Sequence, residues 1–149
     1  MYKLTREHFS YAQFVVWADV IHKLDYEFSQ NTHKMIVNDE TSAPTFVMHD
    51  YYFPNTIDCA YREVCEVLDS VMCMHLYTSF TSYSGSFGRH KDTEDVLIVQ
   101  SIGRMQYSFD DGYTCILNPG DSLFIEKGVY HNPTVLEPRA TLSYSWINC

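Results

Sequence analysis

Apolar residues follow two different spacings along the chain, and the spacing changes near residue 71. Before it, they recur every three to four positions in residues 6–24 and 57–68, which predicts two amphipathic α-helices. The polar, turn-rich residues 29–43 between these helices predict a loop, and residues 44–48 predict a short strand. The first half of the chain therefore reads as a helical flank.

From residue 71 onward, apolar and polar residues alternate, as they do on strands with one buried face. Turn residues recur about every eight to twelve positions, the spacing of an all-β sandwich or barrel. The expected strands cover residues 71–81, 87–92, 96–101, 104–109, 113–117, 122–125, 129–131 and 139–147. We therefore predict a mainly β fold with two helices packed on its outer face.

The length of the chain, 149 residues, is that of one domain. We expect a single domain over residues 1–149, with a helical flank over residues 1–70 and a β-barrel core over residues 71–147. Hydrophobic residues make up 46% of the chain, which is enough for a sizeable core.

The net charge of −9 argues against nucleic acid as a partner, because phosphate binding needs a basic surface. The N-terminal residues form no apolar signal segment, and no apolar run is long enough to span a bilayer. We therefore expect a cytoplasmic protein without a membrane partner. The five cysteines show no C-x-x-C spacing and predict buried thiols rather than a zinc site or disulfides. A homodimer is compatible with the sequence.

Candidate chemistry centres on His90, Asp92 and His131. His90 and Asp92 lie two positions apart in a predicted strand, so their side chains should point to the same side. Two imidazoles and one carboxylate form the facial triad that holds non-haem Fe(II) and leaves positions open. Glu94 shares the strand parity of Asp92 and is the alternative carboxylate. The other reading is that all of these are ordinary polar strand residues.

Two segments resemble known metal-binding motifs. Residues 120–131 resemble the second signature motif of the cupin superfamily, Gly-x5-Pro-x-Gly-x2-His, with Glu126 where the family usually has Pro. Residues 88–104 resemble the metal strand and the next strand of JmjC-type oxygenases, a cupin branch that uses H-x-D. The resemblance implies a double-stranded β-helix, or jelly roll. The metal ligands that it implies are His90, Asp92 and His131.

The same resemblance implies an Fe(II)- and 2-oxoglutarate-dependent oxygenase that hydroxylates its substrate, with a protein side chain as the expected target. Such enzymes need a cation for the distal carboxylate of 2-oxoglutarate, usually Lys or Arg fifteen residues after the first ligand His. Here that position is Met105, and the neighbouring Arg104 has the opposite strand parity. Arg139-Ala140-Thr141 resembles the Arg-x-Ser of many other 2-oxoglutarate oxygenases. The resemblance thus implies that Arg139 anchors the co-substrate and that Thr141 adds a hydroxyl.

The sequence also offers other candidate cations for the co-substrate carboxylate and other candidate functions. Lys91 lies between two ligands and should point outward, and Lys127 lies on a loop. Tyr77 is a candidate for a further hydroxyl at the co-substrate. Arg139 could instead be an exposed residue at a strand start. The alternative functions are a metal-dependent cupin enzyme that does not use 2-oxoglutarate, which Met105 favours, and a non-enzymatic cupin module that binds a ligand. An inward-pointing Arg139 would favour the oxygenase.

Overall fold

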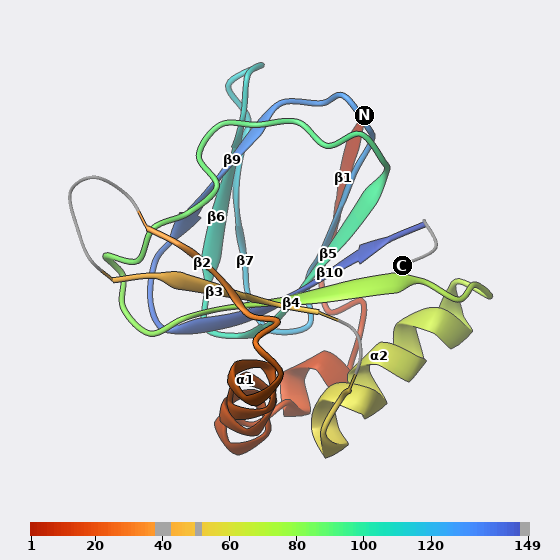
Figure 1. Ribbon diagram of the computed structural model, residues 1–149. Helices are drawn as coiled ribbons and strands as arrows, with labels where there is room; N and C mark the ends of the chain where they lie inside the picture. Colours follow the sequence, from red (N-terminus) through yellow and green to blue (C-terminus); the bar gives the residue numbers. More distant parts are fainter. Residues whose placement is uncertain (38–42, 50–51, 147–149) are drawn as a thin grey trace.

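Two antiparallel β-sheets face each other in the computed structural model, which describes residues 1–37, 43–49 and 52–146 (Figure 1). The strands are β1 (Tyr2–Thr5), β2 (Lys34–Ile36), β3 (Thr45–Met48), β4 (Cys73–Ser79), β5 (Val96–Ile102), β6 (Met105–Phe109), β7 (Thr114–Leu117), β8 (Ser122–Ile125), β9 (His131–Val135) and β10 (Arg139–Ser145). The larger sheet has the order β1-β8-β5-β10-β4-β3-β2, and the smaller has the order β7-β6-β9. The mainly β, jelly-roll fold predicted from the sequence is confirmed.

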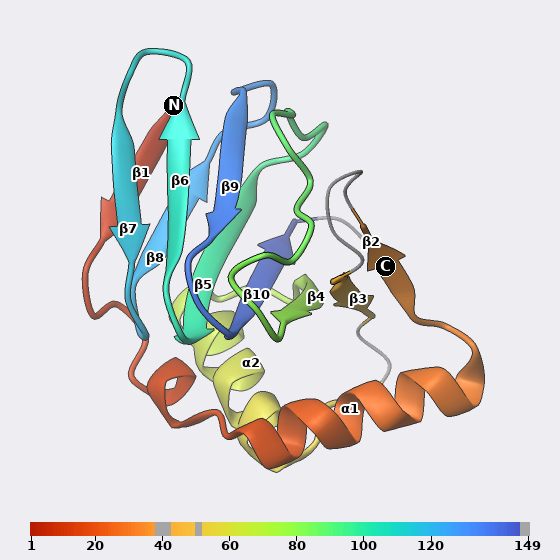
Figure 2. The ribbon, with the colours of Figure 1, turned by 90° about the vertical axis from the view of Figure 1, so that its left-hand side faces the viewer.

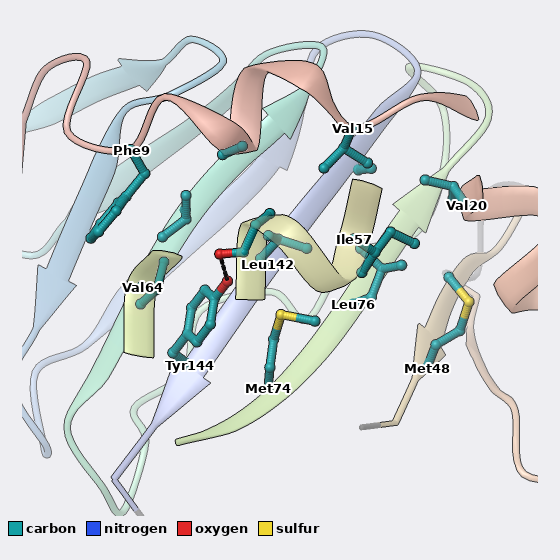
Figure 3. Close-up of a cluster of buried hydrophobic side chains, with 14 of the residues drawn as sticks. Phe9, Val15, Val20, Met48, Ile57, Val64, Met74, Leu76, Leu142 and Tyr144 are labelled. Carbon is teal, nitrogen blue, oxygen red and sulfur yellow. Dashed lines mark hydrogen bonds between the residues drawn. The ribbon is translucent and has the colours of Figure 1, made fainter. Parts of the chain in front are cut away.

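Both helices, α1 (Trp17–Gln30) and α2 (Asn55–Val67), lie against the outer face of the larger sheet, on the side away from the smaller sheet (Figure 2). Their buried side chains pack on alternate residues of the central strands β4, β5 and β10 (Figure 3). The Tyr144 hydroxyl in this layer donates to the Ala60 carbonyl at 3.3 Å, so its polar atom does not lie unpaired among apolar groups. The predicted second helix and the strand at residues 44–48 are confirmed.

The predicted helix over residues 6–24 is wrong at both ends, because α1 begins at Trp17 and continues to Gln30, into the stretch expected as loop. Residues 2–5 form the edge strand β1, which pairs with β8, and a short 3-10 helix, η1 (Tyr11–Phe14), follows. Val16 then has extended backbone angles, φ −109° and ψ 150°, before α1 begins. Tyr2 and Leu4 pack against the core between the two sheets. Phe9, Ala12 and Val15 are buried in the apolar cluster on the helix side of the larger sheet, and this tertiary packing overrides the local helical pattern of residues 6–16.

Two other predictions fail in part. The stretch expected as loop contains the strand β2, while residues 38–42 of that stretch lie outside the described residues. The last strand ends at Ser145, and residue 147 of its predicted range also lies outside them. Strands from the first 70 residues thus form both edges of the larger sheet.

The prediction of buried thiols holds for Cys115 only among the described cysteines. Cys59 is exposed, Cys65 is half-buried, and Cys73 is disulfide-bonded. Within the described ranges, no helix is long and apolar enough to cross a membrane.

Candidate metal and anion site

His90, Asp92 and His131 meet at one end of the space between the two sheets. One ligand atom from each lies within 4.8 Å of the others. Nε2 of His131 is 3.4 Å from Oδ2 of Asp92, and Nε2 of His90 is 3.8 Å from Oδ1. The structure therefore brings together the three residues that the motifs predicted, at a spacing that one metal ion could bridge.

The way in which His90 and Asp92 are placed differs from the prediction. Residues 87–92 do not form a strand, and β9 begins at His131 rather than ending there. Gly88 has a φ of +68°, which breaks the extended conformation. The segment is held instead by an isolated bridge, in which the His90 N–H donates to the His131 carbonyl at 2.9 Å and the His131 N–H donates back at 2.8 Å.

Backbone carbonyls fix the orientation of both imidazole rings. Nδ1 of His90 lies 2.8 Å from the Gly88 carbonyl, and Nδ1 of His131 lies 2.9 Å from the Val129 carbonyl. A carbonyl can only accept, so each Nδ1 carries the proton and each Nε2 presents a lone pair to the centre. Burial lowers the pKa of His131, which keeps its ring neutral as a metal ligand requires.

Glu94, the alternative carboxylate, does not join this group. The described His, Cys, Asp and Glu side chains form one such cluster, and it contains Asp92. The carboxylate of Glu94 accepts a hydrogen bond from the Thr93 hydroxyl at 2.7 Å. Glu94 was expected on the same side as Asp92 because of strand alternation, but the segment is not a strand and the expectation fails.

Arg139, the first residue of β10, points inward and is 2% exposed. Its side chain and the three candidate ligands line one cavity of about 100 Å³. Its Nε donates to the Ser79 hydroxyl at 2.9 Å, and no carboxylate of the described residues forms an ion pair with it. Burial lowers its pKa to about 10. A cation without a counterion thus shares the cavity with the triad.

The other cations near the site lie on the surface. Arg104 pairs with Glu137 at 3.4 Å, and both side chains are exposed. Lys91 and Lys127 are also exposed. Met105 is fully buried and lines the cavity, as its strand parity predicted.

Of the two predicted hydroxyls, only that of Tyr77 belongs to a residue lining the cavity. Burial raises its pKa, so the phenol is neutral and can donate a hydrogen bond. The Thr141 hydroxyl donates instead to Oε1 of Gln100 at 2.8 Å, which uses its single proton. The cavity is also lined by five described residues that the sequence analysis did not assign to the site. They are Phe87, Ile98, Tyr107, Pro133 and Ser143.

No protein-family model matches the chain, and no curated protein matches it either. Solved structures do match. The Escherichia coli protein YcfD aligns with a TM-score of 0.75 at 16% identity, over 99% of this chain and 50% of YcfD. YcfD described as a ribosomal oxygenase in complex with cobalt and 2-oxoglutarate aligns with a TM-score of 0.74 at 18% identity, over 100% of this chain and 48% of YcfD.

A cupin superfamily protein from Desulfitobacterium hafniense aligns with a TM-score of 0.51 at 13% identity, over 75% of this chain and 83% of that one. At such identities the likeness shows the fold alone. The fold is the cupin-like double-stranded β-helix that the two motifs predicted. The chain spans about half the length of the YcfD chains that it matches.

Proposed function

We propose that this domain is an Fe(II)- and 2-oxoglutarate-dependent oxygenase. The observation that carries the proposal is Arg139: a buried guanidinium without a counterion among the described residues, in the cavity that the His90, Asp92 and His131 side chains also line. Within the described part of the chain, Nε is the only nitrogen of this guanidinium with a hydrogen-bond partner. A metal triad and an unpaired cation in one cavity suit a ligand with a metal-chelating end and a carboxylate end.

Burying the Arg139 charge costs folding free energy. A buried cation is destabilising unless an anion compensates it, so folds rarely retain one without a role. A guanidinium binds a carboxylate through two parallel hydrogen bonds, which fixes the orientation of the ligand as well as its affinity. The distal carboxylate of 2-oxoglutarate fits this description, and the neutral Tyr77 phenol lies near enough to interact electrostatically with Arg139.

The three ligands fit a divalent first-row metal. When bound there, iron would supply the oxygen chemistry that side chains lack. The chain supplies fixed ring orientations, a carboxylate and the cavity that they share with Arg139. Because affinity order favours other metals over Fe(II), a purified sample could carry Zn(II) or Ni(II) instead.

For the primary substrate we propose a side chain of another protein. YcfD is described as a ribosomal oxygenase, and it shares this fold over about half of its length. The net charge of −9 suits a neutral or basic peptide and disfavours nucleic acid. We place this activity in the cytoplasm, and the homodimer stays a prediction.

Calorimetric titration of 2-oxoglutarate into Mn(II)-loaded protein tests the proposal. Arg139→Ala should weaken binding by roughly 2 to 4 kcal/mol, near the cost of breaking a buried charged pair, and should leave metal affinity almost unchanged. Arg139→Lys should restore it only in part, since an ammonium group cannot bind the carboxylate through two parallel bonds. Arg104 is an exposed cation next to Met105 in the sequence. Arg104→Ala is therefore the matched control and should bind 2-oxoglutarate as wild type does. Equal affinity of wild type and Arg139→Ala would remove Arg139 from the site.

A second candidate is a metal-dependent cupin enzyme that does not use 2-oxoglutarate. Met105 favours it, because an apolar side chain lines the cavity at the position where the resembled family usually has its cation. Absence of 2-oxoglutarate binding to the wild type at millimolar ligand, with metal bound, would select this candidate or a non-enzymatic cupin module.

A further inference from the structure

A chain of buried hydrogen bonds lies directly behind Arg139. Nε of Arg139 contacts Oγ of Ser79 at 2.9 Å, and Oγ of Ser79 contacts Oγ1 of Thr45 at 2.8 Å. Oγ1 of Thr45 in turn contacts the carbonyl oxygen of Gly85. Ser79 and Thr45 are both fully buried, on the neighbouring strands β4 and β3. The chain thus connects the buried cation to the segment that follows β4.

Chemistry fixes the direction of every bond in this chain. A guanidinium can only donate, so Ser79 accepts from Arg139 and must use its own proton elsewhere. A carbonyl can only accept, so Thr45 donates to Gly85. Ser79 therefore donates to Thr45. Each hydroxyl accepts once and donates once, and aligned bonds of this kind strengthen one another in a low-dielectric interior.

The segment reached by the chain is the one that carries two metal ligands. The Gly85 N–H donates to the Ala43 carbonyl at 3.0 Å, and the Ser86 hydroxyl donates to the Pro133 carbonyl at 3.0 Å. Three residues after Gly85, the Gly88 carbonyl orients the ring of His90. Since no strand holds this segment, these contacts position its first part, while the His90–His131 bridge and the Gly128 N–H that donates to the Asp92 carbonyl at 2.9 Å hold its second part.

We propose that Ser79 and Thr45 are positioning residues, which aim the Arg139 guanidinium into the cavity and tie it to the segment bearing His90. The inference rests on the proposed function, because it assigns these hydroxyls to the binding of the carboxylate end of the co-substrate. With Nε held by Ser79, the two Nη groups of Arg139 are left for a ligand. Rotation of the guanidinium about its stem would misalign both of them.

Calorimetry with 2-oxoglutarate and Mn(II)-loaded protein tests the inference through matched variants. Ser79→Ala should raise the Kd about tenfold, the effect of losing one hydrogen bond to a charged group. Thr45→Val, which keeps the shape but lacks the hydroxyl, should raise it about threefold, because its effect passes through Ser79. Thr45→Ser, which keeps the hydroxyl but loses the methyl group, should bind as wild type does. Ser101→Ala removes a buried hydroxyl that has no hydrogen-bond partner among the described residues, and it is the control for truncation.

A double-mutant cycle separates positioning from general damage to the fold. In an Arg139→Ala background, Ser79→Ala should add less than about a twofold effect, since the group that it positions is gone. A tenfold effect in both backgrounds would show that Ser79 acts on the fold and not on Arg139, and would overturn the inference.

A second measurement needs no ligand. In the nitrogen-15 NMR spectrum, the Nε–H of Arg139 should exchange slowly with solvent in wild type and Thr45→Ser, and faster in Ser79→Ala. Binding of 2-oxoglutarate to wild type with unchanged affinity in Ser79→Ala and Thr45→Val would overturn the positioning role alone. Absence of binding to wild type would overturn the proposed function itself, and with it the role assigned here.

Discussion

The two faces of β10 differ in composition although both are buried. Leu142 and Tyr144 face the helices (Figure 3), and both are fully buried in an apolar layer to which Ala140 also belongs. Arg139 and Thr141, which alternate with these residues along the strand, face the smaller sheet and are 2% and 0% exposed. Burial alone therefore does not tell the two faces apart. What differs is whether the buried atoms are apolar or polar.

This difference assigns opposite energetic roles to neighbouring residues. Each apolar side chain on the helix face contributes transfer and packing energy to folding. Arg139 on the other face carries a charge into the interior without a counterion among the described residues, which is unfavourable for folding. One strand thus holds both a stabilising row of apolar side chains and, on its other face, the proposed anion-binding residue Arg139.

The largest expected effect is on metal binding. His131→Ala should lower Mn(II) affinity more than about 100-fold, since even an outer hydrogen-bond partner of a ligand is worth about 10- to 100-fold. The triple replacement of His90, Asp92 and His131 by Ala should abolish binding, as measured by calorimetry. Glu94→Ala is the control and should bind metal normally. Metal binding by the triple variant at wild-type affinity would show that the site lies elsewhere.

On the helix face, Leu142→Ala should lower the free energy of unfolding by about 2 to 5 kcal/mol, because it leaves a cavity in a close-packed layer. Denaturant titration measures this loss. At a temperature where the variant is folded, its affinity for Mn(II) and for 2-oxoglutarate should equal that of wild type. A large loss of ligand affinity in this variant would show that the two faces are coupled.

A compensated buried charge provides the contrast to Arg139. Lys23 and Glu27 on α1 are both fully buried, with Nζ and Oε1 3.1 Å apart. Burial acts to raise the pKa of Glu27, but hydrogen bonds from Thr32, from the His49 N–H and from Lys23 outweigh it and lower the pKa. The fold therefore stabilises the ionised form. This contribution is present at neutral pH and is lost as the pH falls from the ordinary Glu pKa through the lowered one.

Glu27→Gln should accordingly lower the free energy of unfolding by about 2 to 3 kcal/mol at pH 7, because the amide no longer balances the Lys23 charge. The difference from wild type should shrink as the pH falls below the ordinary Glu pKa, because the unfolded chain then binds a proton at Glu27 while the lowered pKa keeps the folded chain ionised. Denaturant titrations at a series of pH values measure it. A difference that stays constant down to pH 3 would assign the effect to packing.

The smallest expected effect has the opposite sign. Arg139→Met should raise the free energy of unfolding of the ligand-free protein by about 1 kcal/mol, since a buried charge is replaced by an apolar chain of similar length. The same variant should lose 2-oxoglutarate binding. A stabilised but inactive variant would make the trade-off between folding and function on this face directly visible. A destabilised one would indicate that the bond to Ser79 outweighs the cost of the charge.

Alternation predicted most of the barrel, because strands with one buried face leave a clear period in the sequence. It failed for β1 and for residues 87–92. Residues 2–5 are held by pairing with β8, a partner far along the chain that no local pattern encodes. The ligand segment is held by one bridge and by side-chain contacts, so His90 and Asp92 lie together although the strand parity that predicted this is absent.

At the site, motif spacing predicted the three candidate ligands and the position of Met105, and the resemblance of residues 139–141 to Arg-x-Ser predicted Arg139. The environment of Thr141 could not be read in the same way. Its hydroxyl is used by Gln100, and a register shift between Ala140 and Thr141 accompanies this contact. Tyr107 stands two positions after Met105 and thus shares its inward parity, but twelve tyrosines gave no reason to choose it.

Met105 and Arg139 come from different sheets and yet line the same cavity. A cation at either position could therefore reach a ligand carboxylate there. In an evolving lineage, the charge could move from one strand to the other through an intermediate that carries both, without a stage that lacks anion binding. Relatives of this protein would then share a cavity but not a signature residue, and searches that require a cation at one fixed position would pass over them.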